Sequence, residues 1–192
     1  MSDIDEKDVL EVGFKTLFGP VQDLFERLTG SAAEQYGLMW GDSVKMRRTK
    51  RLVKGLAKTK RMLAEAGFDP QAVPDKLLLP IFDGMSVEDD ENLQDMWAAL
   101  LANAASPENA DKVRPGFIAT LKQMSPDEAG ALDWIYDHLL PNGTTKLSVQ
   151  ELSNDIAISE QQIEVCLGAL EAAGLIDSQT RGALAPWSDT NS

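Results

Sequence analysis

The feature that most constrains the fold is a helix-start signal that occurs at four places after residue 80, a serine followed three residues later by an acid or a glutamine. The serine hydroxyl accepts a hydrogen bond from a backbone N–H of the first helical turn, and the longer side chain accepts one from the N–H of the serine. The four pairs are Ser86 with Asp89, Ser125 with Glu128, Ser148 with Glu151, and Ser159 with Gln162. These pairs predict four helix starts.

The composition also favours an all-α fold. Ala, Leu, Glu, Lys and Asp dominate, and runs of β-branched residues are nearly absent. The 192 residues are enough for one good domain or two small ones, each with a core. Cysteine and histidine occur once each, as Cys166 and His138, which excludes a disulfide framework and a Cys/His zinc site within one chain.

Apolar residues at helical spacing predict further helices. In the central part of the chain we expect a long amphipathic helix from about residue 32 to 66, ended by Gly67 in the left-handed conformation. A further helix opens after Pro74, and Pro80 should kink it. The predicted divisions are 1–30, the N-terminal helices; 31–124, the central helical domain; 125–187, a C-terminal module; and 188–192, a disordered tail.

The C-terminal module has the element order of a winged helix. A helix is expected from residue 125 to about 140, and two more over 148–156 and 159–173, separated by a tight turn. Gly174 caps the last of these, and residues 175–187 can form at most a small β-hairpin. Two helices joined by a short turn, with a helix before and a hairpin after, predict a winged-helix-like module.

A basic stretch, KMRRTKRLVKGLAKTKR, occupies residues 45–61 of a chain whose net charge is -13. Nine of its residues are basic and none is acidic. On a helical wheel, Met46, Leu52, Val53, Leu56, Ala57 and Leu63 form the apolar side of an amphipathic helix. Six cations fall in an arc of roughly 100° opposite that side. They are Arg47, Lys50, Arg51, Lys54, Lys58 and Arg61.

Several interpretations of this cationic arc stay open. Regularly spaced cations suit phosphates, but the arc lacks the aromatic residues that bind single strands. Peripheral membrane binding is a further alternative, although the apolar side has no Trp or Phe. A simple solvated face, or neutralisation by acids of the same or another chain, is the remaining choice. The candidate acids are Asp83, Glu88, Asp89, Asp90, Glu91 and Asp95.

The acidic residues suit a helix start better than a metal site. Behind Ser86 they complement the positive end of a helix, and the run EDDE lacks the spacing and the glycine of a calcium loop. In the C-terminal module, the helix in the recognition position carries Glu160, Glu164 and Glu171 but no cation. Because DNA phosphates repel such a helix, we expect protein contacts or dimerisation there instead.

No catalytic constellation stands out. His138 lies near a predicted helix end and has no Ser or Cys partner at a suggestive spacing, and Cys166 lies on an apolar side, where it packs as a small hydrophobe. The sequence contains no dinucleotide-binding, phosphate-binding or zinc-protease motif. We therefore predict no catalytic residue, no cofactor and no metal.

Two segments resemble the signature of the abortive infection alpha family of bacterial phage-defence proteins. They are KLLLPIFDGMSVEDDENLQDMWAALLANAASPE and RPGFIATLKQMSPDEAGALDWI, and the resemblance covers roughly residues 35–140. It implies a role in antiviral defence but carries no catalytic residue with it. The positions that carry it are Asp89, Asp90, Leu93, Trp97, Leu101, Asn103, Arg114, Pro115 and Phe117.

The sequence therefore predicts a non-enzymatic phage-defence protein that acts through protein contacts, with a second copy of itself among the candidate partners. Nucleic-acid binding through residues 45–61 is the first alternative, and peripheral membrane association is the second. The acidic first eight residues are no signal peptide, and no apolar run reaches the roughly 18 residues of a spanning helix. We expect a cytoplasmic protein.

Overall fold

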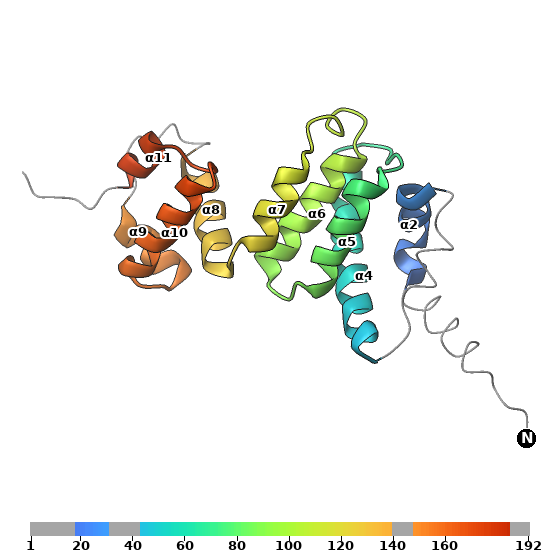
Figure 1. Ribbon diagram of the computed structural model, residues 1–192, viewed down its shortest axis with the longest axis horizontal. Helices are drawn as coiled ribbons and strands as arrows, with labels where there is room; N and C mark the ends of the chain where they lie inside the picture. Colours follow the sequence, from blue (N-terminus) through green and yellow to red (C-terminus); the bar gives the residue numbers. More distant parts are fainter. Residues whose placement is uncertain (1–17, 31–42, 140–147, 185–192) are drawn as a thin grey trace, which may run out of the picture. The chain divides into compact units, whose positions relative to one another are not determined.

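Every regular element in the described part of the chain is a helix, in a computed structural model that describes residues 18–30, 43–139 and 148–184 (Figure 1). The prediction of an all-α protein is confirmed for these residues. The chain divides into two compact units, Met1–Lys122 and Gln123–Ser192. The first unit contains η1 (Gly19–Val21), α2 (Gln22–Thr29), α4 (Ser43–Glu65), α5 (Asp75–Val87), α6 (Glu91–Ala105) and α7 (Pro115–Gln123, which crosses the division). The second contains α8 (Pro126–Leu139), α9 (Val149–Ile156), α10 (Glu160–Ala172) and α11 (Ser178–Ala183).

Helix α4 carries the basic stretch and ends as predicted. Gly67 has a φ of 72°, and the N–H of Phe68 donates to the carbonyl of Leu63 at 3.0 Å. This left-handed cap satisfies a carbonyl that the helix end would otherwise leave free. The part of the predicted helix before residue 43 lies outside the described residues.

The core of the first unit forms where α4, α5 and α6 pack together. Leu56, Met85 and Leu101 are fully buried there, and Trp97 is 1% exposed. A Cβ atom added at Gly84 would overlap the Trp97 ring, so the bare backbone of α5 is what admits the indole. On the other side, Phe25 of α2 stacks on Phe82 with 5.9 Å between ring centroids.

The buried side of α4 differs from the predicted apolar side. Leu52, Leu56 and Leu63 are buried as expected, but Ala57 is exposed and Val53 is half-buried. Small and polar residues take the remaining buried places: Thr49, Gly55 and Thr59. The hydroxyl of Thr59 donates to the carbonyls of Gly55 and Ala98, so the buried hydroxyl keeps its hydrogen bonds.

The predicted helix start at Ser86 is wrong. Helix α5 runs through Pro80 and continues to Val87, so Ser86 lies in its last turn and is fully buried. Its hydroxyl donates to the carbonyl of Asp83 at 2.7 Å instead of capping a new helix. Helix α6 begins four residues later, where the carboxylate of Asp90 accepts the N–H of Leu93 at 3.0 Å.

The other three start signals are confirmed. Ser148 and Ser159 form full capping boxes with Glu151 and Gln162. At Ser125, the backbone N–H donates to the carboxylate of Glu128 at 2.7 Å, and the hydroxyl accepts the N–H of Glu128 at 3.3 Å. These pairs hold because the groups involved are local and exposed.

The second unit packs α8, α9 and α10 around its own core. Leu152, Ile163 and Leu167 lie at the centre, with Trp134 and Cys166 beside them. After α10, Gly174 has a φ of 70° and ends the helix as predicted. The chain then forms α11 where the sequence allowed a hairpin, and residues 148–184 contain no strand. Residues 185–187 of that expected hairpin, like the tail 188–192, lie outside the described residues.

Candidate functional site

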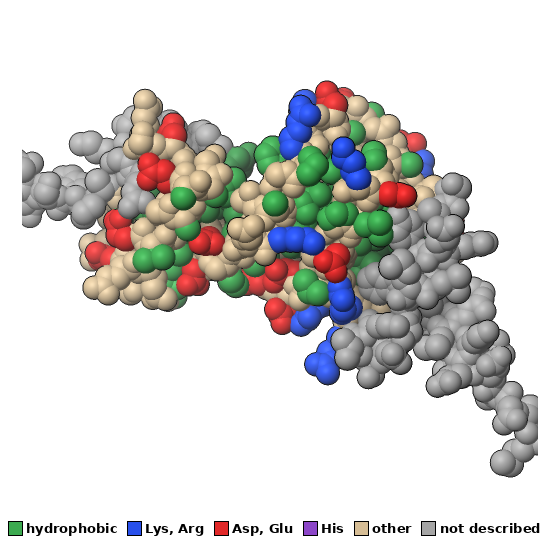
Figure 2. Space-filling model, viewed as in Figure 1, with side chains coloured by type: hydrophobic (Ala, Val, Ile, Leu, Met, Phe, Trp, Pro, Cys, Tyr) green, Lys and Arg blue, Asp and Glu red, His purple; other side chains and the backbone are tan. Residues whose placement is uncertain are grey.

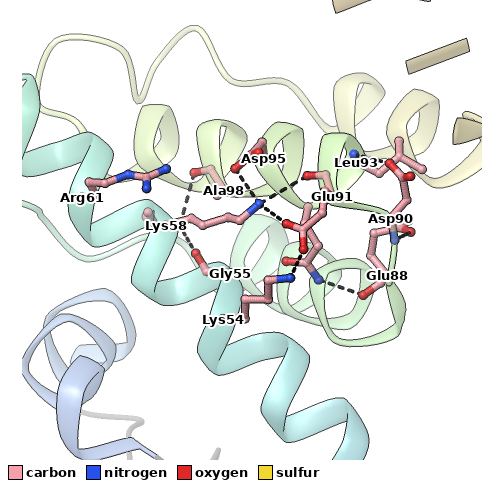
Figure 3. Close-up of polar contacts among 12 residues, drawn as sticks. Lys54, Gly55, Lys58, Arg61, Glu88, Asp90, Glu91, Leu93, Asp95 and Ala98 are labelled. Carbon is pink, nitrogen blue, oxygen red and sulfur yellow. Dashed lines mark hydrogen bonds and ion pairs between the residues drawn. The ribbon is translucent and has the colours of Figure 1, made fainter. Parts of the chain in front are cut away.

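The basic side of α4 faces the junction between α5 and α6, where the acidic residues gather (Figure 3). Four cations of α4 each contact one or two carboxylates of this junction. We call this set the ion-pair row. It consists of Arg48 with Asp83, Arg51 with Asp89, Lys54 with Glu91, and Lys58 with Glu91 and Asp95.

At the N-terminal end of the row, Asp83 receives two cations. A terminal guanidinium nitrogen of Arg48 lies 2.6 Å from its Oδ1, and the Lys122 ammonium lies 3.1 Å from its Oδ2. Partial burial opposes ionisation of Asp83, but hydrogen bonds from Lys122 and Arg48 outweigh it and lower its pKa. Arg48 also donates to the buried hydroxyl of Ser86 at 3.0 and 2.9 Å. Asp83 therefore links α4, α5 and α7.

In the middle of the row, Arg51 spans the end of α5. It lies 2.7 Å from the carboxylate of Asp89 and donates to the carbonyl of Val87 at 3.0 Å. That carbonyl belongs to the last turn of α5, where no further helical N–H can reach it. Arg51 thus serves as a cationic cap for α5.

At the C-terminal end of the row, Lys54 and Lys58 share the carboxylate of Glu91 (Figure 3). The Lys58 ammonium lies 2.9 Å from Glu91 Oε2 and 2.7 Å from Asp95 Oδ1. Hydrogen bonds from Lys54 and then Lys58 lower the pKa of Glu91 to about 2. Burial opposes the charge on Lys58, yet the hydrogen bonds that it donates to Asp95 and Glu91 raise its pKa. Both shifts stabilise the charged forms.

Three members of the predicted cationic arc stand apart from the row. Arg47 and Lys50 are exposed, and among the described residues neither has an ion-pair or hydrogen-bond partner for its side chain. Arg61 only approaches Glu65 one turn along α4, at 3.8 Å. Conversely, the sequence interpretation missed Arg48 and Lys122. Arg48 precedes Arg51 by three residues, a helical spacing that could have placed it on the same side.

The remaining acids shape the connection between α5 and α6. The carboxylate of Glu88 accepts the N–H groups of Asp89 and Asp90, both at 3.0 Å. The buried Gln94 amide donates to the carbonyls of Met85 and Glu88 at 2.8 and 2.9 Å.

Among residues 18–30, 43–139 and 148–184, no three or more His, Cys, Asp or Glu side chains gather as they would around a metal ion.

The family-like positions divide into a buried and an exposed set. Leu93, Trp97 and Leu101 are buried on α6, and Asp89 and Asp90 serve the ion-pair row and the α6 cap. The exposed set lies on the surface of α6 and at the start of α7, where Phe117 is 51% exposed. Its members are Asn103, Arg114, Pro115 and Phe117.

In the second unit, the outward side of α10 is acidic. Glu160 and Glu164 are exposed, Glu171 is half-buried, and Val165 between them is 72% exposed. Figure 2 shows acidic but no basic side chains on the visible face of this unit's described residues. The whole unit contains eleven acids and two basic residues, Lys146 and Arg181.

His138 and Cys166 occupy structural positions in the second unit. The His138 ring stacks on Trp134 with 4.0 Å between ring centroids, and its Nδ1 lies 2.8 Å from the Trp134 carbonyl. The Trp134 indole donates to Asp155 at 2.8 Å. Cys166 is buried, and desolvation, followed by the charges of Asp127 and Glu128, raises the pKa of its thiol. A thiol with a raised pKa is a poor nucleophile.

In the residues that the structure describes, the protein consists of two helical units, with the ion-pair row in the first and the acidic outward side of α10 in the second. The family described as abortive infection alpha matches residues 46–185, and the chain belongs to that family. The resemblance predicted from the two central segments is thus confirmed, and the match extends through α11. Membership implies a role in abortive-infection phage defence.

No curated protein and no solved structure is significantly similar to the chain. Among the described helices, none combines the length and the apolar content that crossing a membrane requires.

Proposed function

We propose that the protein serves phage defence through protein contacts and without chemistry of its own. The observation that carries this proposal is the pairing of Arg51, Lys54 and Lys58 with acids of the same unit. A cation that already holds a carboxylate must give it up to bind a phosphate, so half of the cationic arc is a poor nucleic-acid surface.

The contact module in this proposal is the second unit. Its helices α9 and α10 are joined by a short turn, and in the order of elements α10 corresponds to the recognition helix of a winged helix. An acidic α10 is repelled by DNA, whereas exposed Val165 gives a protein partner an apolar contact. We therefore interpret the winged-helix-like arrangement as a protein-binding device.

A phage challenge tests the proposal. Cells with the gene should yield fewer plaques than cells without it for at least one phage of a broad panel. Val165→Asp should remove this protection without unfolding the protein, because the side chain is 72% exposed. The matched control is Tyr136→Asp, on the outward side of α8 and 62% exposed, which should keep it.

Equal plaque counts with and without the gene across the panel would count against the defence role. Full protection by Val165→Asp would instead exclude α10 as the contact surface. A cofactor or metal retained by the purified protein, seen by native mass spectrometry, would contradict the absence of chemistry.

A further inference from the structure

Helix α7 is attached to the first unit by few buried side chains. Val113, which is 8% exposed, is the last buried residue before it, and we call the ten residues that follow, 114–123, the strap. Within the strap only Ile118 and Leu121 are buried, while seven residues are exposed, among them Phe117 at 51%. A short helix that buries so little apolar surface can open while the rest of its unit stays folded.

One ion pair adds to these two apolar contacts. The Lys122 ammonium, in the last turn of α7, lies 3.1 Å from Asp83 Oδ2 on α5. The two side chains are 40% and 56% exposed, so water and salt can replace this contact. When Lys122 leaves, Arg48 still holds the other carboxylate oxygen at 2.6 Å, and Asp83 keeps a cationic partner. Breaking the ion pair therefore costs the first unit little.

The strap ends where the second unit begins. The division between the units falls between Lys122 and Gln123, and Met124 packs against the core of the second unit. A single residue, Gln123, thus separates a side chain held by the first unit from one held by the second. If the strap leaves the first unit, the ten residues between Val113 and Met124 become the connection.

We propose that the strap is a releasable connection between the two units, which the Lys122–Asp83 ion pair holds closed. In the closed state the strap is docked as α7. In the open state Lys122 leaves Asp83, Ile118 and Leu121 lose their packing, and a tether of ten residues joins the units. A protein that covers the two freed apolar side chains shifts the population towards the open state. This device goes beyond the proposed function, because the opening takes place without a partner.

Amide hydrogen exchange of the full chain, followed by mass spectrometry, tests the proposal. The amides of α7 should exchange through a local opening, faster than those of α5 and α6 and at a rate that low urea concentrations leave unchanged. Raising NaCl from about 0.1 to about 1 M should speed the exchange of α7 by up to about fivefold, because salt screens an exposed ion pair.

Two variants separate the contacts of the strap. Lys122→Gln removes the ion pair, so its α7 should exchange up to about fivefold faster at low salt and lose the response to salt. The matched control Lys76→Gln removes the same charge from an exposed position of α5 and should leave the exchange of α7 unchanged. Leu121→Ala removes one of the two buried side chains and should speed the exchange of α7 at least about tenfold, with α5 and α6 nearly unchanged.

Two results would overturn the proposal. If α7 exchanges at the same rate as α5 and α6, in the wild type and in Leu121→Ala, the strap opens only when the whole first unit unfolds. If α7 of Lys122→Gln exchanges like α7 of Lys76→Gln, the Lys122–Asp83 ion pair does not hold the strap closed. Neither measurement involves a phage or a partner, so a failure here leaves the proposed function standing.

Discussion

Two amphipathic helices of this protein, α4 and α10, carry charged side chains that have different surroundings in the fold. On α4, Arg51, Lys54 and Lys58 reach carboxylates that α6 and its preceding turn supply. On α10, Val165 projects outward at 72% exposure along a side bordered by glutamates. A run of charge on a helix thus indicates an external partner only after its neighbours in the fold are known. The basic run is conspicuous in the sequence, yet three of its cations already hold carboxylates of the same unit.

The largest expected effect is a loss of stability between α5 and α6, the two helices whose junction receives the α4 cations. Gly84→Ala places a methyl group where the buried Trp97 ring lies, and overpacking of this kind costs about 1–3 kcal/mol. The ring cannot move aside easily, because it is 1% exposed. Urea unfolding measures the decrease in the free energy of unfolding, and amide exchange in α5 and α6 shows whether these helices are the ones affected.

The control for that variant is Gly116→Ala. Nothing lies within 4 Å of a Cβ atom at this position, so the change should be neutral or slightly stabilising through helix propensity. If both variants are equally stable, there is room for a Cβ atom between residue 84 and the Trp97 ring, and the close contact between α5 and Trp97 is wrong.

A smaller loss of stability is expected when the N-cap of a helix is removed, and its size should be similar in both units. Asp90→Ala removes the α6 cap, and Ser159→Ala removes the α10 cap, each at a cost of about 1 kcal/mol. Amide exchange near each helix start measures the local loss. A negligible effect at Asp90, together with a clear one at Ser86→Ala in the exchange of α6, would restore the predicted start at Ser86.

The smallest effect is expected in nucleic-acid binding. Only Arg47, Lys50 and Arg61 of the cationic arc lie outside the ion-pair row, so the slope of log K against log salt should be no steeper than about -3. Fluorescence anisotropy with a labelled duplex provides this slope. A slope near -5, with stepwise weakening as Arg51, Lys54 and Lys58 are changed to Glu, would show that the whole arc binds phosphates.

How far the sequence predicts this structure depends on whether a signal is local. Ser148 and Ser159 were placed correctly because both partners of each capping box lie within four residues. Gly67 and Gly174 were also placed correctly, since a left-handed helix end favours glycine wherever it occurs.

Signals that depend on distant residues were not available in the sequence. The prediction at Ser86 is wrong because its hydroxyl donates to a carbonyl within α5 and accepts from Arg48, thirty-eight positions away. The buried side of α4 was misplaced because the hydroxyl of Thr59 finds carbonyl partners, which a hydrophobicity pattern cannot register. The acid cluster was a candidate partner of the cationic arc, but only the packing of α4 against α6 pairs Lys58 with Glu91 and Asp95.

The ion-pair row also gives the first unit a defined acid response. The pKa of Glu91 is about 2 in the folded protein, against an ordinary value of 4.5. A lowered pKa contributes stability that is fully present above the ordinary value and is lost as the pH falls from about 4.5 towards 2. In the variant Glu91→Gln, this part of the acid response should be absent.

The most direct test of the internal pairing of α4 is a titration of the Glu91 side-chain carboxyl by NMR in the full chain. The account predicts a pKa of about 2, which rises when Lys54 or Lys58 is changed to Ala. The matched control is Arg47→Ala, which should leave the titration unchanged. A Glu91 carboxyl that titrates near 4.5 in the wild type would contradict the account, because the cations of α4 would then be available to an external partner.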